Sequence, residues 1–225
     1  MNVLSPLEGY RLWAPTYSAE TAVSHLEDEI VREMTPPLDG LRLLDAGCGT
    51  GRRLIGTAAL DAVGLDLSEE MIEARDRNAL DESRARFAVG DLRSLPVEPE
   101  TFDVVWCRLA VGHVRELGRV YAELTRAARV GGLIIVTDFH PTASEAGHRR
   151  SFRSGDDVCE VEHFVHQQDA HVAFAAMAGL RLRTVREGRI GPAVIDFYAS
   201  RSREAQYAEH LDLPVVLALS FERVQ

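Results

Sequence analysis

Short apolar runs alternate with helical patterns along most of this chain, and the alternation limits the possible folds more than any other feature. The apolar runs, each bounded by turn-forming residues and predicted to be buried strands, are residues 41–46, 62–67, 87–89, 102–107, 133–138, 180–185 and 215–221. The predicted helices are residues 23–34, 52–59, 69–80, 116–128, 169–178 and 200–210. Repeated strand–helix units form a parallel sheet with helices on both faces. The sequence therefore predicts an α/β fold with an open, doubly wound sheet.

Two stretches depart from this alternation. The N-terminal segment, residues 1–36, carries an amphipathic helix that Pro36 ends. Residues 139–168 lose the regular pattern, apart from one possible strand at residues 158–165. We expect a single domain over residues 1–225, in which the N-terminal segment forms a lid and the second stretch is an insertion on the substrate side.

The basic residues of the chain are all arginines, because its 225 residues include no lysine. A Schiff-base lysine and a phosphate-loop lysine are therefore excluded. The 35 acidic residues outnumber the 25 basic ones and give a formal net charge of -10. Such a charge opposes binding to a phosphate backbone unless the arginines gather on one face. We expect a small molecule and no nucleic acid as the partner.

The three cysteines, Cys48, Cys107 and Cys159, are an odd number without C-x-x-C spacing. They indicate neither a disulfide framework nor a zinc knuckle. No apolar run approaches the roughly 18 residues of a membrane span, and residues 1–8 lack the basic and apolar parts of a secretory signal. We expect a cytoplasmic monomer or homodimer that does not contact a membrane.

A glycine-rich turn follows the first predicted strand, where residues 45–51 read DAGCGTG. Glycines permit a tight turn and let a ligand approach the main chain at the carboxyl end of a strand, where open α/β sheets bind ligands. A dinucleotide fingerprint, G-x-G-x-x-G, needs a third glycine where Arg52 stands. Asp45, before the turn, would repel a phosphate but can hold a cationic amine.

Two further acidic residues stand at predicted strand ends. Asp66 lies at the end of the second strand, where a carboxylate can accept both hydroxyls of a ribose. Asp91 follows the third strand and can accept an amino proton of a purine, whose faces Leu67 and Leu92 would flank. Each aspartate alone can equally be a turn residue. Together with Asp45 they predict one acidic rim at the carboxyl edge of the sheet.

These motifs resemble those of class I S-adenosylmethionine-dependent methyltransferases, in the group with ubiquinone and menaquinone C-methyltransferases and small-molecule O- and N-methyltransferases. The resemblance covers residues 10–138 well and the rest in outline. It implies a Rossmann-like sheet of seven strands, mostly parallel, whose last strand runs antiparallel. It also implies S-adenosyl-L-methionine as cofactor and a small organic molecule methylated on an O, N or C atom. The residues expected at the cofactor are Tyr17, Asp45, Gly47, Gly49, Gly51, Asp66, Leu67, Asp91, Leu92 and Cys107.

The chain departs from this family between Gly51 and Asp66, where it is short, so the resemblance implies a trimmed first helix. The aromatic residues of segment 9–17, GYRLWAPTY, resemble a segment that closes over the cofactor in this group. Tyr10 and Trp13 are expected at the substrate. Alternatively, the aromatic rings pack the leading helix onto the sheet.

Histidines are the candidates for a catalytic base. Methyl transfer from a sulfonium is an in-line displacement that needs alignment, and a base helps when the acceptor must lose a proton. His113 and His140 follow the fourth and fifth predicted strands, and histidine titrates near neutrality. Each can equally be a hydrogen-bonded loop residue. No metal is expected, because the strand ends offer no acidic pair of the kind that binds magnesium.

Arginines in the second irregular stretch can bind an acidic acceptor. Arg149, Arg150 and Arg153 carry guanidinium groups that bind carboxylate or phosphate with two hydrogen bonds, although a solvated basic loop is the simpler interpretation. Two other functions stay open. One is a non-catalytic, cofactor-binding partner subunit of the same fold, and the other is a nucleotide-cofactor oxidoreductase, which Arg52 disfavours.

Overall fold

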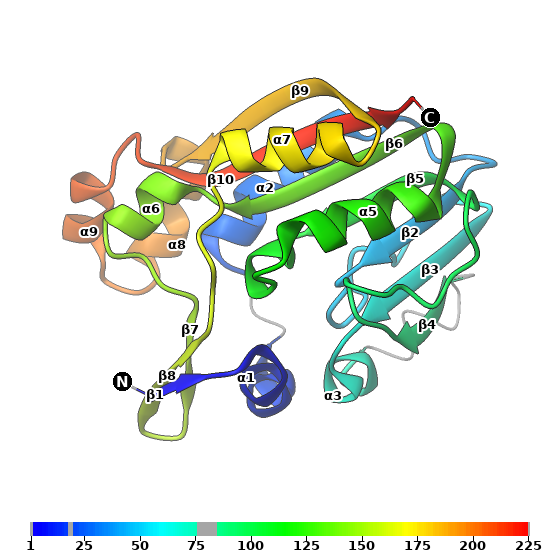
Figure 1. The fold of residues 1–225 in the computed structure, drawn as a ribbon. Helices are drawn as coiled ribbons and strands as arrows, with labels where there is room; N and C mark the ends of the chain where they lie inside the picture. Colours follow the sequence, from blue (N-terminus) through cyan, green and yellow to red (C-terminus); the bar gives the residue numbers. More distant parts are fainter. Residues whose placement is uncertain (1, 18–19, 76–84, 225) are drawn as a thin grey trace.

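The computed structural model describes residues 2–17, 20–75 and 85–224 (Figure 1). Within them, the larger sheet has seven strands in the order β4-β3-β2-β5-β6-β10-β9. These strands are β2 (Arg42–Ala46), β3 (Asp61–Asp66), β4 (Ala85–Val89), β5 (Phe102–Arg108), β6 (Ala128–Phe139), β9 (Leu180–Arg189) and β10 (Pro214–Arg223). Strand β10 is antiparallel to both of its neighbours, and the other pairs are parallel. The predicted seven-stranded sheet with an antiparallel last strand is confirmed.

Helices cover both faces of this sheet, which confirms the doubly wound arrangement. Helices α5 (Leu117–Ala127) and α7 (Gln168–Met177) lie on one face, and α2 (Ala22–Met34) lies on the other (Figure 1). The shorter helices of the described residues are α1 (Pro6–Trp13), α3 (Glu69–Glu73), α6 (Pro141–Glu145), α8 (Ile195–Ala199) and α9 (Glu204–Glu209). Single 3-10 turns are η1 (Ala14–Thr16), η2 (Val111–His113) and η3 (Pro192–Val194).

The central strands are apolar on both faces because both faces are covered. In β2, Leu43 packs with Val31 of helix α2, while Leu44 packs with Leu124 of helix α5. Such strands read as continuous apolar runs instead of alternating ones. This is why the sequence pattern located them.

A second, three-stranded sheet lies below the carboxyl ends of the large sheet in Figure 1. Its strands β1 (Asn2–Leu4), β8 (Asp157–Val161) and β7 (Ser151–Ser154) are ordered β1-β8-β7, with β1 parallel to β8. The indole of Trp13 in α1 stacks on the ring of Phe152 in β7 at 4.9 Å between centroids. The two irregular stretches of the sequence therefore form one unit, here called the cap: β1, α1, β7 and β8. No local pattern predicted this pairing.

Several predicted elements are wrong in extent or kind. Residues 52–59, predicted as a helix, form turns only at 52–56 and reach an isolated bridge at Ala59, because Gly56 takes a positive φ of 73° and the chain must reach β3 within a few residues. The strand predicted at 158–165 ends at Val161, and the predicted helix 200–210 shrinks to α9 and misses α8. Helix α3 ends at Glu73, and residues 76–80 of that prediction lie outside the described residues.

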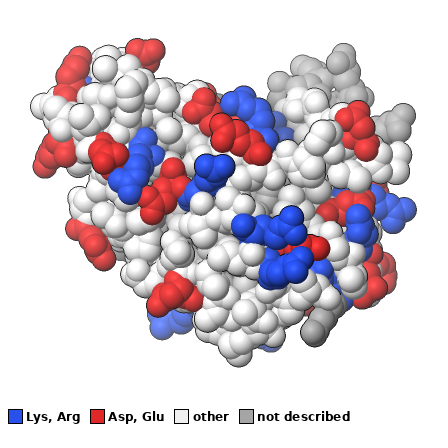
Figure 2. Space-filling model, turned by 90° about the horizontal axis from the view of Figure 1, so that it is seen from above, with Lys and Arg blue, Asp and Glu red and all other residues white. Residues whose placement is uncertain are grey.

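The surface opposite the cap carries both signs of charge. Figure 2, which views the molecule from the top of Figure 1, shows arginines interspersed with acidic side chains. This face therefore presents no continuous basic stripe of the kind that a phosphate backbone requires. Among the described residues, no helix combines the length and apolar character needed to cross a membrane.

Candidate active site

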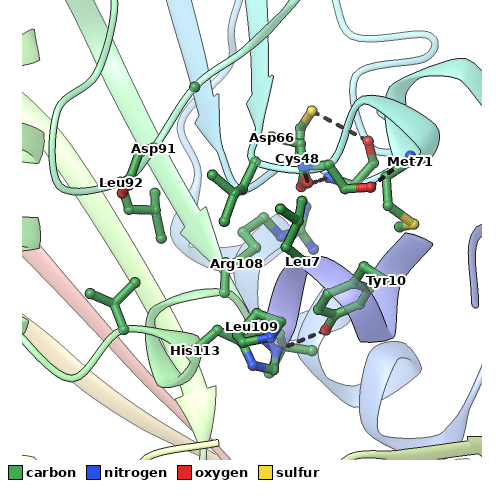
Figure 3. A pocket seen from close by; sticks show the side chains of 18 of the residues that line it. Leu7, Tyr10, Cys48, Asp66, Met71, Asp91, Leu92, Arg108, Leu109 and His113 are labelled. Carbon is green, nitrogen blue, oxygen red and sulfur yellow. Dashed lines mark hydrogen bonds between the residues drawn. The ribbon is translucent and has the colours of Figure 1, made fainter. Parts of the chain in front are cut away.

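A cavity of about 490 Å³ lies where the parallel strands β2, β3, β4 and β5 end, and the cap covers its other side (Figure 3). Its volume is typical of small-molecule sites. Of the residues predicted from the sequence, those that line it are Tyr10, Tyr17, Gly47, Gly49, Asp66, Leu67, Asp91, Leu92 and His113. The cavity thus lies at the carboxyl edge of the sheet, where the topology predicts a ligand site.

The glycine-rich turn holds its shape through main-chain hydrogen bonds. The amides of Gly47 and Cys48 both donate to the carbonyl of Leu65, at 2.7 and 2.9 Å. Gly47 and Gly49 take positive φ values of 83° and 58°. A Cβ on Gly47 would overlap the methyl group of Ala110. Glycine is therefore required both for the conformation and for the close approach of the loop after β5.

Asp66 joins the glycine turn to strand β3. Its carboxylate accepts the amide of Gly49 at 2.7 Å and the amide of Ser68 at 2.9 Å, one on each oxygen. A carboxylate oxygen accepts more than one hydrogen bond, so each oxygen keeps acceptor capacity at the cavity wall. Burial raises the pKa of Asp66 above its usual value, against the amides that stabilise the charged form.

Asp91 and Leu92 line the cavity after β4, but the carboxylate of Asp91 is already engaged. Arg93 donates to it from its amide at 2.8 Å and from its guanidinium at 2.6 Å. These hydrogen bonds from Arg93 lower the pKa of Asp91. The Asp91 carboxylate therefore stabilises the turn that contains it, and a ligand that bound this carboxylate would share it with Arg93. Leu67 and Leu92 bring apolar surface to the cavity wall.

Asp45 corrects the expectation of three carboxylates on one rim. It pairs in register with Gly64 of β3 and Trp106 of β5 and is fully buried, outside the cavity lining. Neither of its oxygens has a hydrogen-bond partner among the described residues. Burial raises the pKa of Asp45 to about 6. Asp45 lies within strand β2, before the glycine turn begins, so its carboxylate is buried between β3 and β5 and does not reach the cavity.

Gly51 and Cys107, expected at the cofactor, also lie outside the cavity lining. Gly51 serves packing, because a Cβ there would lie 2.6 Å from Cζ of Phe87. Cys107 is fully buried within β5, and burial raises the pKa of its thiol. Both residues are packed beneath the lining residues and do not themselves face the cavity.

His113 forms the end of the cavity next to Tyr10 (Figure 3). Its Nδ1 lies 2.8 Å from the carbonyl oxygen of Glu162, and its Nε2 lies 2.8 Å from the hydroxyl of Tyr10. A carbonyl only accepts, so Nδ1 donates, and in the neutral ring Nε2 accepts the tyrosine proton. Burial, with the nearby charge of Arg150, lowers the pKa of His113 to about 3. The imidazole is therefore neutral at physiological pH.

Arg150 lies behind the two cavity tyrosines instead of in the cavity lining. Its Nε donates to the Tyr10 hydroxyl at 3.1 Å, and its Nη2 donates to the Tyr17 hydroxyl at 3.0 Å. The guanidinium also lies over the rings of Trp13 and Phe139, at 5.1 and 5.9 Å from their centroids. Burial disfavours the charged arginine, but the phenols raise its pKa further above the usual value.

Three other predicted site residues lie away from the cavity. His140 accepts the amide of Thr142 at the start of α6 and contacts Glu187, so it does not share the cavity with His113. Arg149 donates to main-chain carbonyls within the connection before β7. Trp13 packs inside the cap. His140 and Arg149 belong to the long connection after β6, which leads away from the cavity, whereas Trp13 is held in the cap by its stacking on Phe152.

The cavity also exposes residues that sequence reasoning did not assign to it, including Met71, Arg52, Arg53 and Arg108. Arg108 has a partial sequence signal, because it ends strand β5. Its partner Glu27, in helix α2, has no sequence signal that would place it here. Glu27 is fully buried and accepts two hydrogen bonds from Arg108, both at 2.9 Å. Arg53 donates to the same carboxylate at 2.7 Å. This buried cluster ties α2 and the glycine turn to β5.

The sheet order, the glycine turn and the cavity at the strand ends define the class: this is the Rossmann-like fold of class I methyltransferases. Residues 44–136, somewhat less than half of the chain, match the family described as Methyltransferase domain. Over these residues the chain matches a methyltransferase domain, which bears out the class predicted from the sequence motifs.

Similar proteins carry methyltransferase names. A malonyl-[acyl-carrier protein] O-methyltransferase of Pectobacterium atrosepticum is 36% identical over 54% of this chain and 47% of its own length. A protein of the same name from Enterobacter lignolyticus is 28% identical over 88% and 77%. The chain thus spans about half the length of the first of these relatives. The crystal structure of an S-adenosylmethionine dependent methyltransferase from Mesorhizobium loti superposes with a TM-score of 0.69 at 23% identity, covering 88% of this chain and 98% of that one.

Proposed function

We propose that this protein is an enzyme that transfers a methyl group from S-adenosyl-L-methionine to an O, N or C atom of a small organic molecule. The observation that carries the proposal is Asp66, a half-buried carboxylate at a strand end that accepts a hydrogen bond from the glycine turn and still lines the cavity. The methyltransferase names of the relatives support the same reaction.

The lining residues fit the parts of this cofactor. Gly47 and Gly49 leave the main chain of the turn uncovered for the methionine part. Asp66 keeps acceptor capacity for the ribose hydroxyls, and Leu67 and Leu92 supply apolar contacts for an adenine ring. Asp91 would contribute as a shared acceptor. Bound there, the cofactor supplies a methyl group on a sulfonium.

The protein's own contribution is alignment and exclusion of water. Tyr10, Tyr17 and His113 form the wall of the cavity on the side of the cap. We assign them to the junction of cofactor and acceptor. The cap would serve as the lid, since β1 pairs with β8 and Arg150 binds both tyrosines, so that the N-terminal segment and the insertion move together.

Calorimetry with S-adenosylhomocysteine tests the cofactor assignment. We expect the wild type to bind, and Asp66→Asn to weaken binding by roughly tenfold or more, because hydrogen bonds to a charged acceptor contribute about 1.5–3 kcal/mol. Asp61→Asn is the matched control, since Asp61 begins the same strand and pairs with Arg86 at the surface. No binding by the wild type, or equal binding by both variants, would contradict the assignment.

We further propose that the enzyme acts in the cytoplasm on a free small molecule, as a monomer or homodimer, without binding nucleic acid. Cys48, Cys107 and Cys159 are buried free thiols, as is usual in a reducing compartment. The mixed charges of the face in Figure 2 agree with the absence of a nucleic-acid partner. Light scattering after gel filtration measures the oligomeric state.

A further inference from the structure

Leu109 has a backbone conformation that leucine rarely adopts. Its φ is 53°, in the left-handed region, where a Cβ crowds the following carbonyl and glycine is favoured. The other non-glycine residues with positive φ in the described part of the chain are exposed polar residues in turns: Glu100, Ser202 and Asp212. Leu109, in contrast, is apolar and only 8% exposed. A buried leucine in this conformation therefore needs an explanation.

A buried network of hydrogen bonds holds the main chain of Leu109 in place. Its amide donates to the carbonyl and to the hydroxyl of Thr137, at 3.1 and 2.9 Å. The Thr137 hydroxyl donates onward to the carboxylate of Glu27 at 2.9 Å, and the same carboxylate binds the guanidinium of Arg108. These contacts fix the backbone at residue 109 without using its side chain. Backbone strain that the surroundings enforce in this way is concentrated at functional sites.

The side chain of Leu109 belongs to the cavity and not to the core. It is in none of the four apolar clusters that form the core of the described residues, whereas it does line the cavity. A glycine at this position would relieve the main chain and leave those clusters intact. The presence of leucine is therefore explained by what the cavity holds.

Leu109 lies between the two parts of the cavity. The next residue, Ala110, packs on the glycine turn, because a Cβ on Gly47 would overlap its methyl group. The carbonyl of Ala110 also accepts the amide of His113 at 3.1 Å. Figure 3 shows Leu109 on the same side of the cavity as His113 and Tyr10. If the glycine turn binds the methionine part of the cofactor and His113 faces the acceptor, Leu109 lies where the methyl group passes from one to the other.

We propose that Leu109 sets the size of the alkyl group that the site can hold on the cofactor sulfur and so restricts the enzyme to methyl transfer, an inference that rests on the proposed function. In the displacement, the bond from carbon to the acceptor forms as the bond from carbon to sulfur breaks, and the electron pair of the broken bond stays on sulfur. Sulfur, carbon and acceptor must lie in one line. A side chain beside that line limits the substituents that the carbon can carry.

Calorimetry with three cofactor analogues tests this proposal without an acceptor. S-adenosylhomocysteine, S-adenosylmethionine and S-adenosylethionine carry no third substituent, a methyl group and an ethyl group on sulfur. We expect the wild type to bind the ethyl analogue about tenfold more weakly than the methyl one, because one methylene too many in an apolar pocket has about this effect. In Leu109→Gly and Leu109→Ala this ratio should fall below about threefold, since the methylene then finds space. A wild-type ratio near one, or a ratio that both variants leave unchanged, overturns the proposal.

Leu67→Ala is the matched control, because Leu67 also lines the cavity but in the part assigned to the adenine. This variant should weaken the binding of all three analogues alike and keep the wild-type ratio. If its ratio falls as far as that of Leu109→Ala, the cavity has loosened as a whole, and the specific role of Leu109 is refuted.

Thermal unfolding tests the backbone argument separately. Glycine usually destabilises a protein relative to alanine, but the order reverses where φ is positive. Leu109→Gly should therefore melt at a higher temperature than Leu109→Ala, and the opposite order would contradict the view that leucine is kept here against backbone strain. The two proposals fail differently. A wild type that binds none of the three analogues removes the proposed function, whereas one that binds the methyl and ethyl analogues equally removes only the role of Leu109.

Discussion

Gly112 lies directly against His163. A Cβ on Gly112 would overlap Nε2 of that histidine and lie 2.7 Å from Oδ1 of Asp138. The same Nε2 lies 3.3 Å from Asp138 Oδ1, and the amide of Phe164 donates to the Gly112 carbonyl at 2.7 Å. The segment that links the cap to α7 thus packs against η2 at Gly112, where there is no room for a side chain.

Gly112→Ala should therefore destabilise the protein. The added methyl group must displace His163 from Asp138 or shift the main chain, and such overpacking costs about 1–3 kcal/mol. Thermal unfolding measures the change. Gly191→Ala is the control, because Gly191 has extended backbone and its Cβ would meet no atom closer than 3.9 Å. Equal melting temperatures for the two variants would refute the steric argument.

Glu27→Gln should cost far more stability than Asp28→Asn. Glu27 is buried between Arg108 and Arg53, and removing its charge takes away the carboxylate that pairs with Arg53 and leaves the buried Arg108 with only the half-exposed Asp28, at a cost of about 3–5 kcal/mol. Asp28 also pairs with Arg108, but its side chain is 49% exposed, and such pairs contribute about 0–1 kcal/mol. Urea unfolding at pH 7 compares the two variants, and similar losses would contradict the expectation.

The Glu27 carboxylate also makes the free energy of unfolding depend on pH in the acidic range. Although burial opposes it, the charges of Arg53 and Arg108 lower the pKa of Glu27 in the folded state. The unfolded chain then binds the proton more readily than the folded one, so this contribution is present above the unfolded pKa and is lost as the pH falls through the folded one. Glu27→Gln should show a weaker loss of stability below about pH 4.5 than the wild type.

Asp45→Asn should stabilise the protein in the absence of ligand. The folded pKa of about 6 lies above the usual 3.8, so the folded state binds the extra proton between these values and the wild type loses stability as the pH rises through them. At pH 7 to 8 the substitution removes a buried charge that accepts no hydrogen bond among the described residues and that the nearby Arg108 and Arg53 offset only in part, and the gain is at most about 3 kcal/mol. Urea unfolding at pH 4 and pH 8 measures it. A gain that is no larger at pH 8 than at pH 4 would contradict the raised pKa.

His113 should give the opposite dependence on pH. Its folded pKa of about 3 lies below the usual 6.5, so the unfolded chain takes up a proton first and stability falls as the pH drops from 6.5 towards 3. The slope is at most about 1.4 kcal/mol per pH unit. His113→Gln should flatten this part of the curve. The same slope in the wild type and in the variant would show that His113 does not titrate as described.

The site was predictable where its residues belong to local patterns at strand ends. Asp66 and the glycines of the turn follow apolar runs, and parallel strands bring their carboxyl ends to one edge whatever the rest of the chain does. Asp45 was misplaced by the same reasoning, because one residue along a strand separates the rim of the sheet from its buried interior. The spacing of residues in the sequence does not show which residue at a strand end is the first to reach the carboxyl edge of the sheet.

The sequence by itself determined the strand–helix alternation, the class of fold and the position of the glycine turn, since each rests on periodicity or on conformations that few residues adopt. Only the tertiary structure decided which side chains share the cavity. Glu27 and Arg108 are 81 residues apart, and Tyr10 meets His113 across 103 residues. Such contacts arise from how the cap and α2 pack on the sheet, and burial and charge then set the protonation of each group, which no short segment encodes.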